Sequence, residues 1–289
     1  MILITGAGGT CGRELVRLMS RTGVPFRAGY STEVKAGLAR RKGIDAVVAD
    51  LLRPASLGPA LLGIDTLFLL SGWSPEQTLV ETGLVRASLH AGVRRIVKLS
   101  VWDAGSEAFS FARIHRPVEK AIEESAAGWT FLRPNGFMQN VSNFASATVR
   151  SQSTLYAQAA DAPVSHVDVR DVARVAAVAL TQPGHEGRIY ELSGPEAITY
   201  RQMASILSVL LGRNVACVEL TPDQARNQMV AGGIPPAYAD AVDDLTRYYA
   251  DGRAARVSPD VRHVTGADPI PFDLFARDHL ASFQQEGSS

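Results

Sequence analysis

Gly6, Gly9 and Gly12 recur at every third position between an apolar run at 2–5 and a segment at 12–21 with helical spacing of its apolar residues. Glycine lets a backbone approach a phosphate closely, and a helix N-terminus adds unpaired N–H groups and the positive end of its dipole. The spacing differs from the tighter Gly-x-Gly-x-x-Gly pattern, so the argument depends on the strand before and the helix after. We predict that this turn binds nucleotide phosphates. The alternative is an ordinary tight turn.

The end of the predicted second strand indicates which dinucleotide would bind. In NAD sites an Asp or Glu at this place usually accepts a hydrogen bond from the ribose 2′-hydroxyl. Residues 27–32 contain no carboxylate, and Glu33 comes later. Ser31, Thr32 and Lys35 could instead surround a 2′-phosphate, or they could be plain loop residues. The sequence therefore favours NADP(H), with NAD(H) as the alternative cofactor.

Further residues next to predicted strand ends are expected to line the same cofactor. They are Thr10 and Cys11 in the glycine turn, Asp50 and Leu51 near the adenine, and Leu70, Ser71 and Gly72 along the middle of the cofactor. Asp50 could equally cap a helix. Cys11 is expected to face the phosphate or to pack beneath it as a small residue, without a redox role.

Strands and helices alternate through the first half of the chain. Apolar runs typical of strands lie at 2–5, 25–30, 45–49, 66–70, 95–99 and 129–133. Helices are expected at 12–21, at 74–91 with Ser74 as the capping residue, and at 111–125. This series predicts an α/β fold with a parallel, doubly wound sheet of the Rossmann type.

The second half is less regular. Strands are expected at 164–167 and 188–192, helices at 169–181, 199–211, from 221, at 236–249 and at 272–284, and frayed residues at 284–289. We predict a nucleotide-binding domain at 1–150 and a smaller, mainly helical lobe at 151–289 that covers the strand ends, where open parallel sheets bind ligands. The boundary is soft because a strand within 164–193 could return to the large sheet.

Composition argues against several classes of function. The 29 Lys and Arg residues balance the 29 Asp and Glu residues, so no net charge draws the chain to nucleic acid or to an anionic membrane. Cys11 and Cys217 cannot form a disulfide framework, and neither they nor His166, Asp168 and Asp171 have a metal-ligand spacing. No apolar run approaches the about 18–20 residues of a membrane span, and no leader precedes the first strand. We expect a cytoplasmic protein that acts on a small molecule.

Several segments resemble the atypical short-chain dehydrogenase/reductases of the NmrA-like group, with patterns similar to type 2 quinone oxidoreductases and triphenylmethane reductases. The segments are the turn at 5–12, the strand at 95–100, His-Arg-Pro-Val-Glu-Lys at 115–120, Phe-Leu-Arg-Pro-Asn-Gly-Phe at 131–137, and the stretches at 166–173 and 232–235. The resemblance covers essentially the whole chain. It implies NAD(P) binding, a Rossmann domain and a C-terminal substrate lobe, but it does not indicate the substrate.

The catalytic residues of the wider superfamily are only partly matched. Its members use Tyr-x-x-x-Lys, and no tyrosine of this chain has lysine four residues later. The position that resembles the tyrosine holds His115, and Glu119 replaces the lysine on the same helical face. We predict that His115, with a pKa near neutrality, relays a proton or orients the substrate, and that Glu119 supports it. A packed histidine and a solvated carboxylate are the alternatives. Ser100 could bind a substrate oxygen or simply end a strand.

If the family geometry holds, the residues after the 129–133 strand border the nicotinamide, namely Asn135, Gly136 and Phe137. Trp102, Phe137, Met138 and Asn140 could wall the substrate, although aromatic residues and Met more often lie in the core.

The missing tyrosine restricts the chemistry. Hydride transfer to a quinone, an iminium or a conjugated aromatic acceptor needs little proton donation, so such a site can still belong to a reductase. We predict an NAD(P)H-dependent oxidoreductase that reduces an electron-poor small molecule. The alternative is a non-catalytic nucleotide sensor that binds a partner protein.

Overall fold

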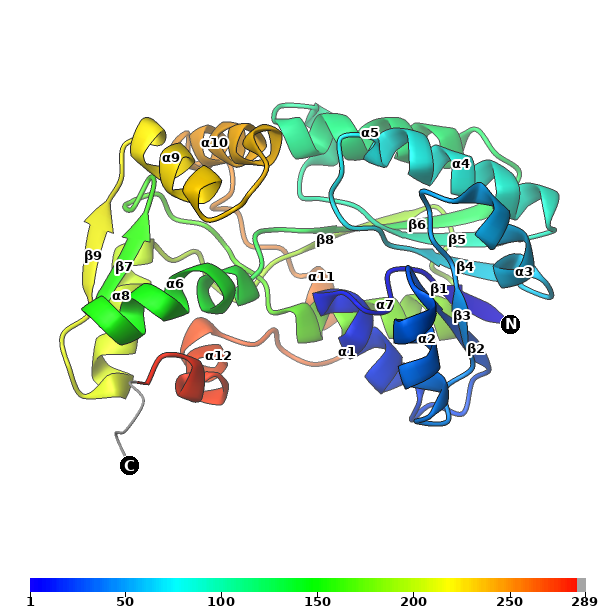
Figure 1. Cartoon of the computed structure of the whole chain (residues 1–289), viewed down its shortest axis with the longest axis horizontal. Coiled ribbons are helices and arrows are strands. Elements are labelled where there is room, and N and C mark those ends of the chain that lie inside the picture. Colours follow the sequence, from blue (N-terminus) through cyan, green and yellow to red (C-terminus); the bar gives the residue numbers. More distant parts are fainter. Residues whose placement is uncertain (285–289) are drawn as a thin grey trace.

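The computed structural model describes residues 1–284, and its centre is a seven-stranded parallel sheet (Figure 1). The strands lie in the order β3-β2-β1-β4-β5-β6-β8. They are β1 (Ile2–Ile4), β2 (Phe26–Tyr30), β3 (Ala46–Val48), β4 (Thr66–Leu69), β5 (Arg95–Leu99), β6 (Gly128–Pro134) and β8 (Arg188–Leu192). The order reverses between β1 and β4, which is where doubly wound sheets bind ligands. The predicted α/β fold class with a Rossmann-type sheet is confirmed.

Helices cover both faces of this sheet (Figure 1). The helices beside it are α1 (Thr10–Met19), α2 (Glu33–Arg40), α3 (Leu57–Leu61), α4 (Gln77–His90), α5 (Ser110–Glu123), α7 (Val169–Thr181) and α11 (Asp260–Thr265). Helices α1 and α7 pack with Ile4 and Val97 on one face, whereas α3, α4 and α5 pack with Leu3 and Ile96 on the other. Successive strand residues point to opposite faces, so a strand covered on both sides is buried throughout, as all four residues of β4 are.

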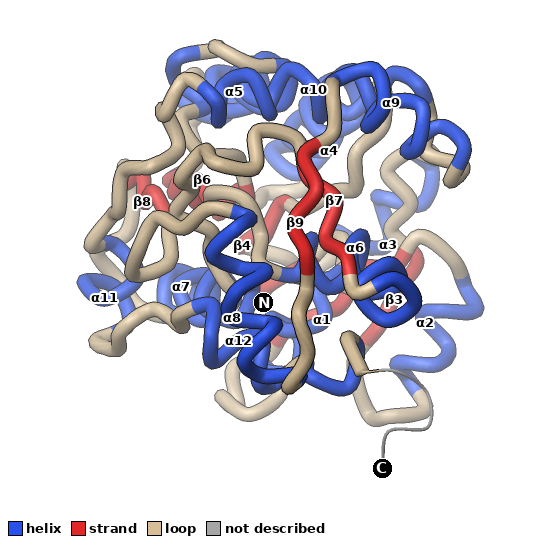
Figure 2. The backbone as a smooth tube through the Cα atoms, turned by 90° about the vertical axis from the view of Figure 1, so that its left-hand side faces the viewer, coloured by secondary structure: helices blue, strands red, loops and turns tan. Residues whose placement is uncertain are grey.

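A smaller lobe lies beyond the carboxyl ends of the strands. It contains α6 (Gln139–Gln152), β7 (Thr154–Ala157), α8 (Tyr200–Leu211), β9 (Ala216–Glu219), α9 (Pro222–Ala231), α10 (Pro236–Ala250) and α12 (Phe272–Asp278). Strands β7 and β9 form a separate parallel pair (Figure 2). The core of the lobe contains Leu155, Leu207, Phe272 and Phe275.

The segment between the two halves crosses back to the large sheet. Strand β8 pairs with β6, and α7 packs against α1. The expected strand at 164–167 is wrong, because these residues form only isolated bridges, Val164 with Ile198 and Val167 with Phe137. A domain division near residue 150 stays a prediction.

Several predicted elements differ at their ends. Helix α4 begins at Gln77 without a side-chain cap, and the Gln77 N–H instead donates to the carbonyl of Ser74 at 3.1 Å in the preceding turn. The predicted Ser74 cap is therefore wrong. Helix α12 ends at Asp278 and is followed by a short 3-10 turn at Leu280–Ser282. The expected fraying at 285–289 lies outside the described residues.

Within residues 1–284, no helix is long and apolar enough to cross a bilayer. The same residues contain no cluster of three or more His, Cys, Asp and Glu side chains that could hold a metal ion.

Candidate active site

The glycine turn is built so tightly that side chains are excluded from it. Gly6 has φ +62°, and a Cβ atom there would lie 2.7 Å from the carbonyl oxygen of Leu70. A Cβ atom on Gly12 would lie 2.1 Å from the carbonyl oxygen of Gly6. The Thr5 hydroxyl ties the turn to the end of β4, because it donates to the Leu70 carbonyl at 2.8 Å and accepts from the Leu70 N–H at 3.0 Å. The backbone of α1 therefore starts directly above the strand ends.

The start of α1 fits a phosphate group. Its N-cap is Gly9, no side chain of the described residues caps it, and no acidic residue lies in its first turn. A polar hollow of about 390 Å³ opens beside it, lined by Thr10, Arg13 and Arg150 among others. Free N–H groups, the helix dipole and two guanidinium groups together suit an anion.

Cys11 is placed as a packing residue. Its side chain is buried in the core beneath the turn. Burial, and secondarily the nearby Glu14 carboxylate, raise the pKa of the Cys11 thiol to about 12. The thiol therefore stays protonated and packs as a small apolar group, as the sequence predicted.

In the segment after β2, no unpaired carboxylate faces the glycine turn. Glu33 forms an ion pair with Arg40 on α2. Thr32 caps α2 by accepting a hydrogen bond from the N–H of Lys35 at 3.4 Å. The Lys35 side chain reaches toward the turn, with its Cδ 3.8 Å from where a Cβ on Gly8 would lie.

The loop after β3 has a structural role for its acid. Asp50 accepts from the N–H of Leu52 at 3.1 Å and lies 3.4 Å from Arg53. Asp50 thus stabilises a turn and caps no helix, so the helix-capping alternative for Asp50 is wrong. Leu51 is half-buried against the core below the sheet. Contact of either residue with an adenine stays a prediction.

A buried polar cluster behind the ends of β4 and β5 was missed by the sequence analysis. Lys98 on β5 is fully buried, and its Nζ forms an ion pair with Glu81 of α4 and lies 3.1 Å from Nδ1 of His115. Ser71, after β4, donates to the Glu81 carboxylate at 2.5 Å. One signal was available in the sequence: Lys98 is the single charged residue inside an otherwise apolar run at 96–99.

His115 therefore differs from its predicted chemistry. Burial lowers the pKa of His115 to about 4, and the neighbouring Lys98 adds to this effect against the opposing Glu81 and Glu119 carboxylates. The imidazole is neutral near pH 7, so the predicted pKa near neutrality is wrong. A neutral imidazole can still donate one hydrogen bond.

Glu119 does not support His115 directly. Its two carboxylate oxygens accept from the Arg133 guanidinium at 3.0 and 2.6 Å, and Arg116 lies 3.2 Å away. Burial would raise the pKa of Glu119, but Arg133 outweighs it and the pKa lies below its usual range. The side chain is fully buried, so the alternative of a solvated carboxylate is also wrong.

Ser100 after β5 and Asn135 after β6 differ in their hydrogen-bond partners. The buried Ser100 hydroxyl makes no well-formed hydrogen bond within residues 1–284, and it lies close enough to the Glu119 carboxylate to help lower the pKa of that group. The Asn135 amide donates to the Ser165 hydroxyl and to the Ala254 carbonyl, both at 2.9 Å, so it ties β6 to the small lobe. Contact of Asn135, Gly136 or Phe137 with a nicotinamide stays a prediction.

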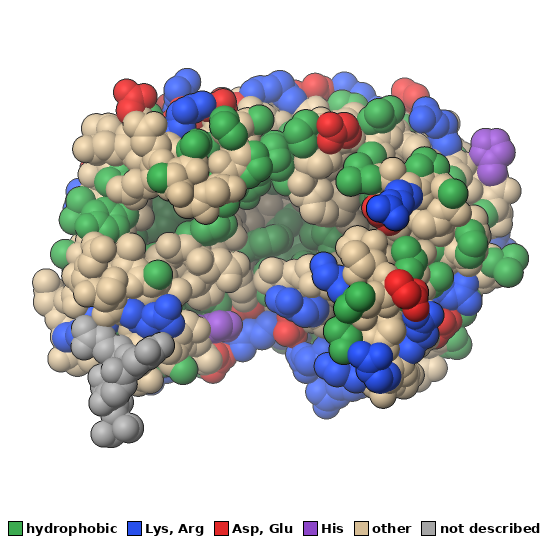
Figure 3. Space-filling model, in the orientation of Figure 1, with side chains coloured by type: hydrophobic (Ala, Val, Ile, Leu, Met, Phe, Trp, Pro, Cys, Tyr) green, Lys and Arg blue, Asp and Glu red, His purple; other side chains and the backbone are tan. Residues whose placement is uncertain are grey.

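A largely apolar cavity of about 560 Å³ lies between the end of β6 and the small lobe. Figure 3 shows the molecule hollowed below α9 and α10, with hydrophobic side chains inside. Gly136, Asn140, His166 and Tyr249 line it, and its lining contains no Asp, Glu, Lys or Arg. A Cβ on Gly136 would lie 2.8 Å from the Tyr249 hydroxyl, so glycine keeps this wall open.

Three residues that were predicted to wall the substrate lie outside the lining of this cavity. Trp102 is buried in a cluster with Phe109 and carries Arg256 over its ring at 4.6 Å. Met138 is buried in the core of the small lobe, and Phe137 packs against the sheet. None of the three lines the cavity, because each fills the core, which was the alternative stated for aromatic residues and Met.

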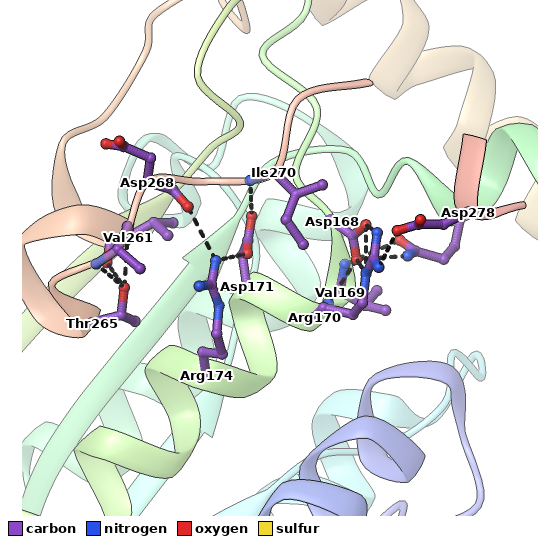
Figure 4. Close-up of polar contacts among 12 residues, drawn as sticks. Asp168, Val169, Arg170, Asp171, Arg174, Val261, Thr265, Asp268, Ile270 and Asp278 are labelled. Carbon is purple, nitrogen blue, oxygen red and sulfur yellow. Dashed lines mark hydrogen bonds and ion pairs between the residues drawn. The ribbon is translucent and has the colours of Figure 1, made fainter. Parts of the chain in front are cut away.

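Two acidic residues at the start of α7 connect the large sheet to the small lobe through ion pairs and hydrogen bonds (Figure 4). Asp168 caps α7 by accepting from the Arg170 N–H at 2.8 Å, and it also binds the Arg170 guanidinium, which reaches Asp278. Asp171 accepts from the N–H of Ile270 at 2.7 Å and pairs with Arg174. Asp168 is therefore the N-cap of α7.

Comparisons with known proteins agree with this architecture. The family model described as the NmrA-like family matches residues 1–265. The chain is 38% identical to a (4-alkanoyl-5-oxo-2,5-dihydrofuran-3-yl)methyl phosphate reductase of Streptomyces griseus, over 99% of this chain and 100% of the other. It is 34% identical to an NAD(P)H azoreductase of Xenophilus azovorans, over 98% and 99%. The structure of an NADPH-dependent quinone oxidoreductase from Escherichia coli, complexed with NADPH, is similar with a TM-score of 0.88, 26% identity and coverage of 97% and 100%.

Proposed function

The chain belongs to the NmrA-like family, and from that premise we propose that it is an NADPH-dependent reductase of uncharged, electron-poor small molecules such as quinones. The observation that carries the proposal is the pairing of two features at one edge of the sheet. An uncapped helix start behind a glycine-rich turn suits a dinucleotide phosphate, and a cavity without charged side chains suits an apolar acceptor. The reductase names of the 38% and 34% identical relatives support the same class.

The glycine turn, the apolar cavity and His115 have separate roles in this proposal. The turn at Gly6–Gly12 would hold the pyrophosphate, and a bound reduced nicotinamide would supply the hydride. The apolar cavity excludes water and positions the acceptor. When a quinone accepts a hydride, negative charge develops on its oxygen. His115 lies outside the lining of the cavity, and we propose that its neutral imidazole donates a hydrogen bond to this oxygen once the cofactor and the acceptor are bound, while solvent supplies the proton.

NADPH oxidation with a panel of neutral quinones, imines, azo compounds and triphenylmethane dyes tests the proposal. We expect the fastest turnover with uncharged quinones, because a charged acceptor would enter the cavity without a counter-charge. Tight NADPH binding without oxidation by any acceptor would instead support the non-catalytic sensor.

The cofactor preference can be measured directly. We expect NADPH to bind about tenfold more tightly than NADH, because no free carboxylate faces the ribose site and Lys35 lies over the turn. Lys35→Ala should weaken NADPH binding about fivefold and leave NADH unchanged. Lys42→Ala, on the exposed turn after α2, is the matched control. Equal dissociation constants for the two cofactors in the unmodified protein would contradict this prediction.

His115→Ala is expected to lower turnover about tenfold to a hundredfold, less than the about hundredfold to thousandfold usual for losing such a donor, because an electron-poor acceptor needs less help. NADPH affinity should stay within about twofold, since the phosphate turn is untouched. The measurement is kcat on the best quinone together with a cofactor titration. His90→Ala, at the exposed end of α4, serves as the control. Full activity in His115→Ala would reduce this residue to packing.

A further inference from the structure

Five polar side chains form a largely buried cluster between α4, β5, α5 and the loop after β4. Lys98 is fully buried and Glu81 almost so, and their charges neutralise each other. Ser71 and Gln77 donate to the same Glu81 oxygen at 2.5 and 3.1 Å, and His115 lies 3.1 Å from Lys98. Such a pair adds little stability, since desolvation of two ions cancels most of their attraction. The cluster is therefore better explained by what it positions than by what it stabilises.

The hydrogen-bond partners of His115 determine which ring nitrogen carries the proton. The ammonium group of Lys98 has donors and no acceptor, so Nδ1 of His115 must accept from it and the ring proton must be on Nε2. Nε2 lies 3.5 Å from the Gln77 amide nitrogen, which already donates to Glu81 and cannot accept. Within residues 1–284, the Nε2 proton of His115 thus has no acceptor. The ring is only half-buried, so a ligand could supply one.

We propose that Lys98 is a positioning residue that holds His115 as a neutral imidazole with its proton on Nε2, and that Glu81 fixes Lys98 and the Ser71 loop in turn. This inference rests on the proposed reductase function for its catalytic meaning. The site then presents an uncharged donor to an acceptor that becomes negative only after hydride arrives. Protonating His115 would add a charge to a cluster in which Lys98 is already balanced by Glu81, and Glu119 is engaged by Arg133. His115 therefore stays a neutral hydrogen-bond donor across the physiological pH range.

The tautomer can be read without any activity or cofactor. In uniformly ¹⁵N-labelled protein, we expect the His115 ring to show a bare Nδ1 and a protonated Nε2, with no titration above about pH 5.5. Loss of the signal in His115→Asn identifies the resonance. A proton on Nδ1, or a titration near the ordinary histidine pKa of 6.5, would overturn the inference even if the protein proves to be a quinone reductase.

Lys98→Met tests whether the Lys98 ammonium sets the protonation state of His115. Without the ammonium, His115 faces the Glu81 carboxylate alone, so its pKa should rise and its resonance should titrate within the neutral range. Turnover should fall about tenfold and acquire a matching inflection with pH, while NADPH affinity stays within about twofold. Lys98→Arg keeps the charge and a donor and should restore the unmodified pH profile. If both variants titrate and turn over like the unmodified protein, Lys98 does not set the state of His115. A failure of all quinone reduction with the expected tautomer intact would count against the proposed function alone.

Discussion

Glu119→Ala is expected to lower the free energy of unfolding by about 3 kcal/mol or more, because it leaves the Arg133 guanidinium buried without its counter-charge. Arg133 comes from the end of β6 and is 8% exposed, and both of its hydrogen bonds to Glu119 are lost in the variant. Urea unfolding at neutral pH measures the effect. Glu123→Ala is the matched control on the same helix, since it removes a half-exposed partner of Arg116 and should cost under about 1 kcal/mol.

The double variant Glu119→Leu/Arg133→Met sharpens this result. Replacing both charges by apolar groups should recover most of the stability, because neither ion then needs to be desolvated. The stabilisation by Glu119 should also depend on pH in a defined direction. Its pKa is lower in the folded protein than its ordinary value of 4.5, so its contribution is complete at neutral pH and declines as the pH falls below that value. A Glu119→Ala variant that is fully stable but inactive would instead revive the idea that this carboxylate supports His115.

The fold was predictable because its signals are local. The apolar runs of β1, β4 and β5 are buried on both faces, and such runs separated by helical patterns specify a parallel sheet. The elements that were missed lack this signal. Strand β9 (Ala216–Glu219) is mostly exposed, and helix α2 buries only Ala36 and Ala39. Short, solvent-facing elements depend on their neighbours rather than on their own pattern.

The site was only partly predictable, for a different reason. Local geometry suffices for Gly12, whose Cβ would meet the carbonyl of Gly6, and for the positive φ of Gly6, although the close contact of Gly6 is with Leu70 after β4. The partners of His115 and Glu119 come from other strands, Lys98 on β5 and Arg133 on β6. The sequence spacing placed His115 and Glu119 on one helical face, but the two side chains bind different cations. Sequence spacing along one helix cannot show which charges approach across the sheet.

Gly9→Val is expected to raise the dissociation constant for NADPH at least about thirtyfold, which is about 2 kcal/mol. Gly9 has φ −77° and ψ 175°, a conformation that valine adopts readily, and a Cβ there would contact only the Gly6 carbonyl at 3.3 Å. The variant should therefore fold, unlike one at Gly12, where the same carbonyl would lie 2.1 Å away. Its branched side chain would occupy the space above the start of α1, where we place the phosphate.

The measurement is a fluorescence titration with NADPH, alongside thermal unfolding of the same sample. Gly83→Val provides the control, because a Cβ on this α4 glycine meets nothing within 4 Å and lies away from the turn, so its NADPH affinity should be unchanged. Weak NADPH binding in a Gly9→Val protein that unfolds like the unmodified chain would assign the loss to the blocked turn. Unchanged affinity in that folded protein would show that the cofactor phosphates do not lie at the start of α1.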